Sequence, residues 1–268
     1  MILASVPPTH IYLSIITAVA YALPAIWNRK VPAQAMRAWV GVAWVFHAIT
    51  LGWLLLGEKP YFGFAPALSL TAWLTAAFYA VEAQIFFPQL PTRWSLAAFA
   101  GIAVLLALLF PGAPLPDTAS PWLPVHLVFG VACYGLFGLA VAHAWFMTRA
   151  EARIRKAADP HSGLPLLTLE RLTYRFVSAG FVLLSATLLI GYFFGDAVRG
   201  HGNGWRWDHK TVFSLLSWIT IAVLLIGRGA FGWRGKRAVH VLYAGSIFLL
   251  LAYVGSRFVL EVLLGRMA

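Results

Sequence analysis

The stretch from residue 205 to residue 227 reads WRWDHKTVFSLLSWITIAVLLIG, and it decides the fold class of this chain. From Thr211 to Gly227 it contains no Asp, Glu, Lys or Arg. A helix of about 20 mostly apolar residues is long enough to cross a lipid bilayer. The tryptophan-rich residues before it are typical of the membrane–water interface. We therefore interpret this stretch as an interfacial loop followed by a transmembrane helix.

The same apolar pattern recurs along the whole chain. Its 268 residues are 61% hydrophobic and only 11% charged, whereas soluble domains carry about 25% charged residues. The runs lack the alternation of a β-barrel, and a lipid-exposed backbone has to satisfy its own hydrogen bonds. The predicted fold is an all-α polytopic membrane bundle, a single integral membrane domain over residues 1–268. We expect eight spanning helices, at about residues 10–27, 38–56, 66–87, 94–110, 122–148, 173–195, 211–227 and 238–262.

The distribution of positive charge predicts the topology. The net charge is +11, and fourteen of the 20 Lys and Arg residues fall in the connections on one side. The positive-inside rule makes that side cytoplasmic, so both termini are expected outside. The excess also favours anionic membrane lipid over nucleic acid as the partner. No Lys or Arg precedes Arg29, so we expect the first span to be retained and not removed as a signal peptide.

The only cysteine, Cys133, lies in the middle of the fifth predicted span. A single cysteine excludes an internal disulfide bond. It also excludes a Cys-x-x-Cys pair, so the chain is not itself a thiol oxidoreductase or a c-type cytochrome. We expect Cys133 to be a small buried apolar residue.

Two histidines within the predicted spans are candidates for function. His126 lies about four residues inside the outer end of span 122–148, and His47 lies near the middle of span 38–56. Ionisable groups inside a membrane are costly and tend to be functional. For His47 an interhelical hydrogen bond and a cofactor role both remain open, and His126 by itself fits an interfacial histidine without a ligand. His143 is about 25 Å from His126 along one helix, so one iron cannot bind both.

The tryptophan-rich loop is predicted to share the outer face with His126. Trp205 and Trp207 offer flat apolar surfaces, and Arg206 and Lys210 can pair with carboxylates. Asp208 either orients a histidine or caps the following helix, whose first turn favours an acid. The two tryptophans can also be plain interfacial anchors. The combination with His126 favours a site for a flat, anionic, iron-containing ligand.

These motifs resemble the cytochrome c assembly superfamily of haem-handling membrane proteins, whose members carry a tryptophan-rich WWD loop. Residues 205–218 resemble the end of that loop and the helix behind it. Residues 120–126, SPWLPVH, resemble the start of the helix that carries the family's first external haem-ligating histidine. His47 resembles a histidine within the membrane in the CcsA-type branch. The length and the ending LAYVGSRF at 251–258 are most similar to the YpjD-like, or HemX-like, branch.

The resemblance implies a bacterial inner-membrane protein that binds haem b during cytochrome c assembly. It implies His126 as an axial ligand of the haem iron, with His47 at a place where haem enters or passes within the bilayer. The second axial ligand is left open between His209, His201, a partner's residue and water. The implied partners are haem, and apocytochrome c or another membrane protein of the assembly pathway. The residues implied to pack on the porphyrin, hold its propionates or support the loop are Trp205, Arg206, Trp207, Asp208 and Lys210.

The chain departs from the CcsA-type pattern at two places. Where that branch usually has a second external histidine, the chain reads Gly-Ser-Arg at 255–257, and where it has a second membrane histidine, the chain reads Ile-Gly-Arg at 226–228. Because half of the four-histidine set is missing, the resemblance does not imply haem lyase activity by this chain alone. A non-enzymatic membrane scaffold or regulator is the first alternative. A small-solute or ion transporter is the second, although no inverted repeat is evident.

Overall fold

The computed structural model describes residues 8–27, 32–57, 61–85, 94–114, 122–155, 166–195 and 207–263. Helices make up almost all of this part of the chain, as the apolar runs predict, so the all-α polytopic membrane bundle is confirmed. The elements are α1 (Pro8–Trp27), α2 (Ala33–Leu56), β1 (Tyr61–Phe62), α3 (Phe64–Ile85), α4 (Trp94–Leu109), β2 (Ala113–Pro114), α5 (Trp122–Arg155), α6 (Leu166–Phe193), α8 (His209–Phe231), α9 (Gly235–Leu250), η2 (Leu251–Gly255), α10 (Ser256–Phe258) and η3 (Val259–Leu263).

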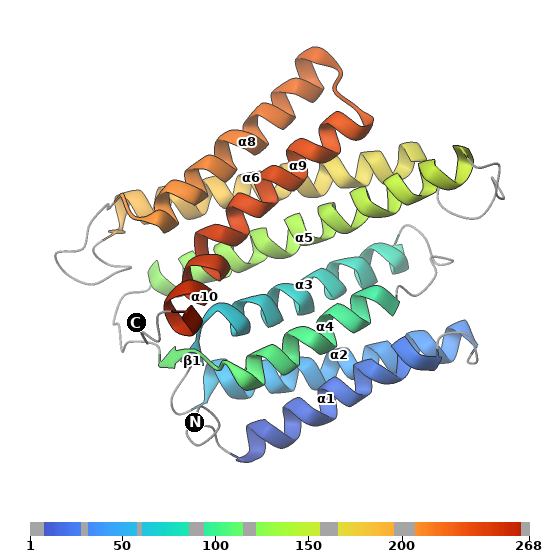
Figure 1. Cartoon of the computed structure of the whole chain (residues 1–268), viewed down its shortest axis with the longest axis vertical. Helices are drawn as coiled ribbons and strands as arrows, with labels where there is room; N and C mark the ends of the chain where they lie inside the picture. The colour runs from blue at the N-terminus through green and yellow to red at the C-terminus, as the bar shows by residue number, and fades with distance from the viewer. Residues whose placement is uncertain are drawn as a thin grey trace. The chain divides into compact units, whose positions relative to one another are not determined.

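Each of the eight predicted spans coincides with a helix. By length and composition, five of the described helices can cross a membrane: Gln34–Leu56, Val125–Ala152, Leu166–Phe193, His209–Phe231 and Gly235–Leu263. Three shorter apolar helices, Pro8–Leu23, Phe64–Ala80 and Leu96–Leu109, bring the number of crossings to between five and eight. Successive helices within each part of the chain run in opposite directions (Figure 1), which agrees with alternating connections on the two sides.

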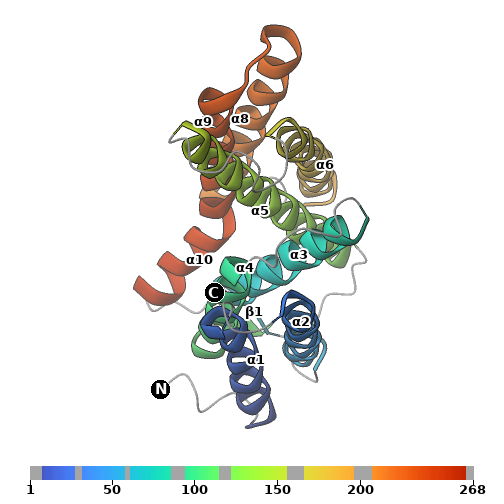
Figure 2. The ribbon, with the colours of Figure 1, turned by 90° about the vertical axis from the view of Figure 1, so that its right-hand side faces the viewer.

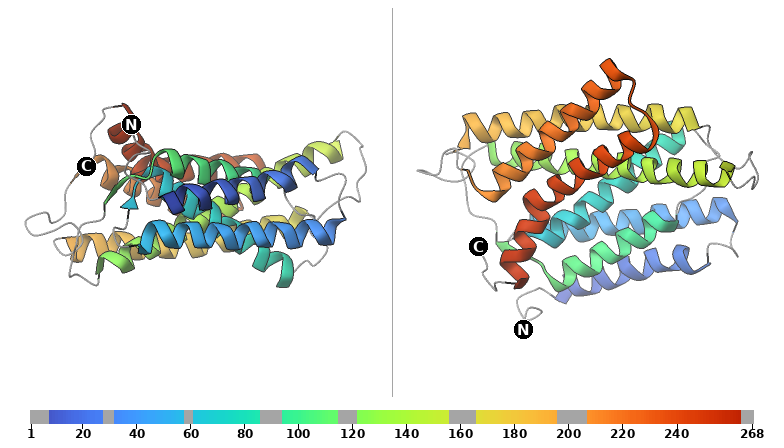
Figure 3. Two further views of the ribbon diagram at one scale, coloured as in Figure 1. Left: turned by 90° about the horizontal axis from the view of Figure 1, so that it is seen from below. Right: turned by 45° about the horizontal axis from the view of Figure 1, so that its top comes forward.

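The chain forms two compact units. The N-terminal unit comprises Met1–Asp117 with Arg257–Ala268, and the C-terminal unit comprises Thr118–Ser256. Figure 2 shows α1, α2, α3 and α4 of the N-terminal unit gathered in one bundle. Figure 3 shows α5, α6, α8 and α9 of the C-terminal unit, coloured from green to red-orange, gathered in another. A single domain over the whole length stays a prediction.

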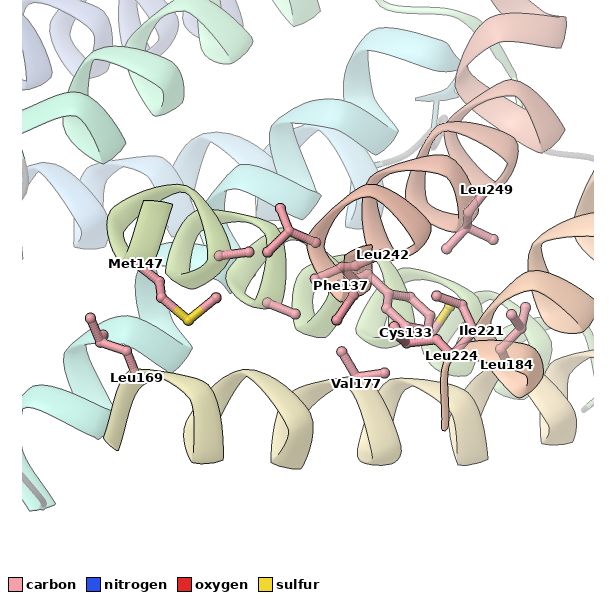
Figure 4. Close-up of a cluster of buried hydrophobic side chains, with 14 residues drawn as sticks. Cys133, Phe137, Met147, Leu169, Val177, Leu184, Ile221, Leu224, Leu242 and Leu249 are labelled. Carbon is pink, nitrogen blue, oxygen red and sulfur yellow. The ribbon is translucent and has the colours of Figure 1, made fainter. Parts of the chain in front are cut away.

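The two units have different cores. The buried cluster of the N-terminal unit consists of one tyrosine and six alanines: Ala20, Tyr21, Ala43, Ala72, Ala97, Ala100 and Ala103. Small residues let helix backbones approach closely, which is how membrane helices pack without a hydrophobic driving force. The C-terminal unit instead buries large side chains such as Phe137, Leu184 and Ile221 together with Cys133 (Figure 4). Cys133 is a free thiol that is 1% exposed, so its prediction as a small buried apolar residue is confirmed.

A short β ladder closes one end of the N-terminal unit, and the sequence did not predict it. Strands β1 and β2 are antiparallel, with Tyr61 opposite Pro114 and Phe62 opposite Ala113. Gly112 has a φ of 86°, and a Cβ atom on it would lie 2.5 Å from the carbonyl oxygen of Phe62. Only glycine permits this approach. Pro114 in β2 has a restricted backbone, which suits a short extended pair.

The last helix changes its winding near residue 251. After α9 the chain makes a π-helical turn, η2, and a second one follows at η3. The hydroxyl of Tyr134 on α5 donates a hydrogen bond to the carbonyl oxygen of Leu249, just before the first π turn. A side chain that inserts into the backbone ladder of a helix is a known cause of such local changes. Tyr134 therefore accounts for the start of the π-helical segment.

Candidate functional site

The end of the C-terminal unit that the charge distribution predicts to face outward is built first from α5 and α6. Trp122 opens α5 and stacks on Phe194 with ring centroids 3.9 Å apart and an interplanar angle of 11°. His126 lies one helical turn further on, with a partly buried side chain. A Cβ atom on Gly191 of α6 would lie 3.6 Å from Cε1 of His126. The imidazole of His126 therefore lies at van der Waals distance from the position that a side chain at Gly191 would occupy.

The start of α8 supplies the second part of the site. Trp207 directly precedes α8, and its side chain is 71% exposed. Asp208 is the N-cap of α8, because its carboxylate accepts a hydrogen bond of 2.8 Å from the backbone N–H of Thr211. This contact is one of the two roles that the sequence left open for Asp208, and the capping role is confirmed. His209 begins the helix and is exposed.

Lys210 faces an aromatic ring from the last helix. Its Nζ lies 5.8 Å from the ring centroid of Tyr253 in η2, within the range of a cation–π interaction. Tyr253 in the π-helical turn thus lies beside the cation of Lys210 at the start of α8. Tyr253 was not singled out as a site residue, because no local pattern links it to Lys210.

The predicted site residues of the C-terminal unit that the structure describes lie at one end of this unit. Figure 1 shows the start of α5, the end of α6, the start of α8 and η2 at the same end of this unit. His126, Trp207 and Lys210 therefore share that end. Trp205, Arg206 and His201 lie outside the described residues.

His47 belongs to the N-terminal unit and lies in a hydrogen-bond network between helices. Its side chain is 0% exposed. Nδ1 is 3.3 Å from the hydroxyl of Tyr21 on α1, and Nε2 is 2.8 Å from the hydroxyl of Ser69 on α3. The interhelical hydrogen bond that the sequence left open is thus present. Iron ligation by His47 stays a prediction, and it requires one of these two hydrogen bonds to be given up.

Ion pairs lie at the two places where the CcsA-type resemblance led us to expect histidines. Arg257 lies 3.9 Å from Glu261, one turn further along the last helix, so the pairing that their spacing suggests is confirmed. Arg228 at the end of α8 lies 2.6 Å from the carboxylate of Glu170 on α6. These arginines therefore stabilise helix ends through neighbouring carboxylates, a role that differs from metal ligation.

This end of the C-terminal unit carries residue types that a haem would need. An iron porphyrin needs an axial donor, apolar surfaces for its ring and positive charge for its propionates. His126 supplies an imidazole, the exposed indole of Trp207 supplies an apolar face, and Lys210 supplies a cation. The residue types present are those that such a ligand requires.

Comparison with known proteins gives a consistent result. Residues 40–264 match the family described as "Cytochrome C assembly protein". The chain is 31% identical over 169 residues to the inner membrane protein YpjD of Escherichia coli strain K12, covering 62% of this chain and 63% of that protein. It is 26% identical over 241 residues to the cytochrome c biogenesis protein CcsA of Prochlorococcus marinus strain MIT 9303, covering 77% of this chain and 75% of that protein. No solved structure matches.

The match to YpjD spans slightly less than two thirds of that protein's length. Together with the apolar helices, this similarity indicates a multi-pass protein of the bacterial inner membrane. The family match covers residues from both compact units.

Proposed function

Because the chain belongs to the cytochrome c assembly protein family, we propose that it binds haem at the outer face of the inner membrane and takes part in cytochrome c assembly. The observation that supports this proposal most is the presence of His126, Trp207 and Lys210 at one end of the C-terminal unit. In this proposal His126 is an axial ligand of the haem iron. The relatives named for cytochrome c biogenesis support the same pathway.

The surrounding residues have distinct roles in the proposed site. Gly191 lies beside the imidazole of His126, and the stacked pair of Trp122 and Phe194 lies one turn nearer the end of the unit. The indole of Trp207 packs on the porphyrin, and Lys210 pairs with a propionate. Asp208 acts indirectly, since it fixes the first turn of α8 from which Lys210 projects.

The remaining predicted ligands complete the proposal. Trp205 and Arg206 belong to the same loop and are proposed to extend the porphyrin contact and the propionate contact. His209 is exposed beside Trp207 and is a candidate second axial ligand. His47 is proposed to meet haem only within the bilayer, after its bond to Tyr21 or Ser69 opens.

The proposal is tested by the absorption spectrum of the detergent-purified chain with haem b. We expect a Soret band that shifts or is lost in His126→Ala, because the iron loses an axial nitrogen. His240→Ala is the matched control, since His240 is an exposed histidine of the same unit at the start of α9. Absence of bound haem, or an equal change in both variants, contradicts the proposal.

A second function is favoured by the two ion pairs that stand where the family has histidines. Since Arg257 pairs with Glu261 and Arg228 pairs with Glu170, the chain is proposed as a membrane scaffold or regulator without lyase activity of its own. It would then hold another membrane protein of the pathway. Copurification of a stoichiometric partner that persists in a His126→Ala, Trp207→Ala variant supports this function over haem binding.

A further inference from the structure

The end of the C-terminal unit opposite the proposed haem site carries a large excess of positive charge. Residues 149–175 and 228–237 contain ten Lys and Arg residues against three acidic residues. The end of α5, the start of α6 and the turn from α8 to α9 lie at this end of the unit (Figure 1). The exposed cations of the described residues include Arg171, Arg175, Arg234, Lys236 and Arg237.

The carboxylate of Glu170, whose side chain is 13% exposed, contacts two of the cations at this end of the unit. Oε1 of Glu170 lies 2.6 Å from Nη1 of Arg228 and 3.5 Å from Nε of Arg234. The guanidinium of Arg228 also stacks 3.6 Å from the ring centroid of Tyr174. Two positive charges share one negative charge, so this cluster retains a net positive charge. The side chain of Arg234 remains 66% exposed.

The turn between α8 and α9 is a rigid corner. A Cβ atom on Gly227 would lie 2.4 Å from the indole of Trp233, so the ring packs directly on the α8 backbone. The guanidinium of Arg237 lies 3.9 Å from the centroid of the same ring. Phe231 beside it is 72% exposed. Cations and an exposed aromatic ring thus occupy one corner, as expected at the level of lipid headgroups.

An apolar crevice lies beside this corner, between α5, α6, α8 and α9. Its lining includes Met147, Val177 and Leu242, with Glu170 and Gly235 also on its wall. Its volume is about 20 Å³, far below the roughly 300–1,000 Å³ of sites that enclose a small molecule. Because Met147, Val177 and Leu242 are at most 6% exposed, this space is a packing void inside the bundle, and a ligand of the corner can contact only its surface cations.

We propose that the corner formed by Arg234, Lys236 and Arg237 binds the headgroup of an anionic phospholipid. The positive-inside rule assigns this end to the cytoplasmic leaflet, which is rich in anionic lipid. Juxtamembrane cations attract such lipids by about 1 kcal/mol each, or about fivefold in affinity. Arg237 on the indole of Trp233 and Arg234 beside Glu170 already have contacts that hold them, so these two cations need less ordering on binding.

The test counts the lipids retained by the detergent-purified full-length chain in native mass spectrometry, with phosphatidylglycerol and phosphatidylcholine as probes. We expect preferential retention of phosphatidylglycerol. A Lys236→Gln, Arg237→Gln variant should bind it about 25-fold more weakly. The matched control is Arg149→Gln, Arg155→Gln, which removes two charges from the end of α5 in the same unit and should retain the lipid. Equal melting temperatures without lipid verify that both variants fold.

Several outcomes overturn the proposal. Equal retention of the two lipids shows that the corner does not recognise an anion. An equal loss in the corner variant and in the α5 variant shows diffuse attraction without a site. Displacement of phosphatidylglycerol by inorganic phosphate or by RNA assigns the corner to another anion. If the double variant fails to fold, Lys236→Gln alone should still weaken binding about fivefold, and an unchanged affinity contradicts the proposal.

Discussion

At the scale of single residues, His47 explains how a histidine is tolerated inside the bilayer. A neutral imidazole has one nitrogen that donates and one that accepts. The hydroxyls of Tyr21 and Ser69 can each take either role, so both nitrogens are satisfied in either tautomer. A buried polar group without such partners is costly. The three side chains therefore link α1, α2 and α3 at one buried point.

This network predicts a measurable coupling between His47 and Ser69. Ser69→Ala should lower the free energy of unfolding by about 1 kcal/mol, and a double-mutant cycle with His47→Phe should give a coupling of about 0.6 kcal/mol, as is typical between membrane helices. Reversible unfolding in mixed detergent micelles measures both values. Thr71→Ala is the control, since Thr71 bonds Ala67 in its own helix. A coupling of zero for Ser69, or the same coupling for Thr71, contradicts this account.

The surroundings of His126 differ from those of His47. Its side chain is only partly buried, and it lies against a glycine. The sequence could place His126 near the outer end of its helix from the length of the apolar run alone. It could also mark Gly191 as a small residue suited to close helix packing. It could not indicate that the two residues meet, since they lie on different helices.

At the scale of elements, the N-cap of α8 lies directly beside residues of the candidate site. Asp208 at the N-cap satisfies the N–H of Thr211, and the residues on either side are Trp207 and His209. Caps of this type stabilise helices by about 1 kcal/mol. The geometry of the candidate site at this end therefore depends on a cap that the sequence already suggested.

Two substitutions of Asp208 separate the effect of its capping hydrogen bond on stability from the effect of its negative charge. Asp208→Ala should lower the free energy of unfolding by about 1 kcal/mol, because the cap is lost. Asp208→Asn keeps an acceptor of similar shape and should change stability by a few tenths of a kcal/mol only. Thermal unfolding followed by tryptophan fluorescence measures both variants. An equal loss in both variants would show that the negative charge of Asp208 matters and that its capping hydrogen bond does not.

The helices could be predicted from hydrophobic runs, but two irregular elements could not. The β ladder depends on Gly112 meeting the backbone of Phe62, which is a contact between distant parts of the sequence. The π-helical turn at residues 251–255 follows a hydrogen bond from Tyr134 to Leu249. Neither contact leaves a periodic pattern. The same limit applies to Tyr253, whose ring meets Lys210 only because of the fold.

At the scale of the whole molecule, the two units rely on different packing. Alanines dominate the core of the N-terminal unit, whereas large aliphatic and aromatic side chains fill the C-terminal unit. The sequence predicted the membrane bundle from composition, since 61% hydrophobic residues exclude an ordinary soluble domain. It did not predict the division into two units, because the connection between them resembles the other short loops.

The topology gives a prediction for the whole chain. In intact spheroplasts, a membrane-impermeant maleimide should label Leu56→Cys at the end of α2 but not Phe231→Cys at the end of α8. Both positions are exposed. The natural Cys133 is buried in its helix bundle, so the parent chain provides an unlabelled background. Labelling of Phe231→Cys before lysis, with Leu56→Cys protected, would reverse the assigned orientation.

The central claim is that the imidazole of His126 binds haem iron, and chemical rescue tests it most directly. Purified His126→Gly should show a weakened and shifted Soret band, because an axial nitrogen is missing. Free imidazole should then restore the spectrum of the unaltered chain, since it can occupy the space left by the side chain. The same addition should leave a His240→Gly variant unchanged. A His126→Gly spectrum identical to that of the unaltered chain, or one that imidazole does not restore, contradicts the claim.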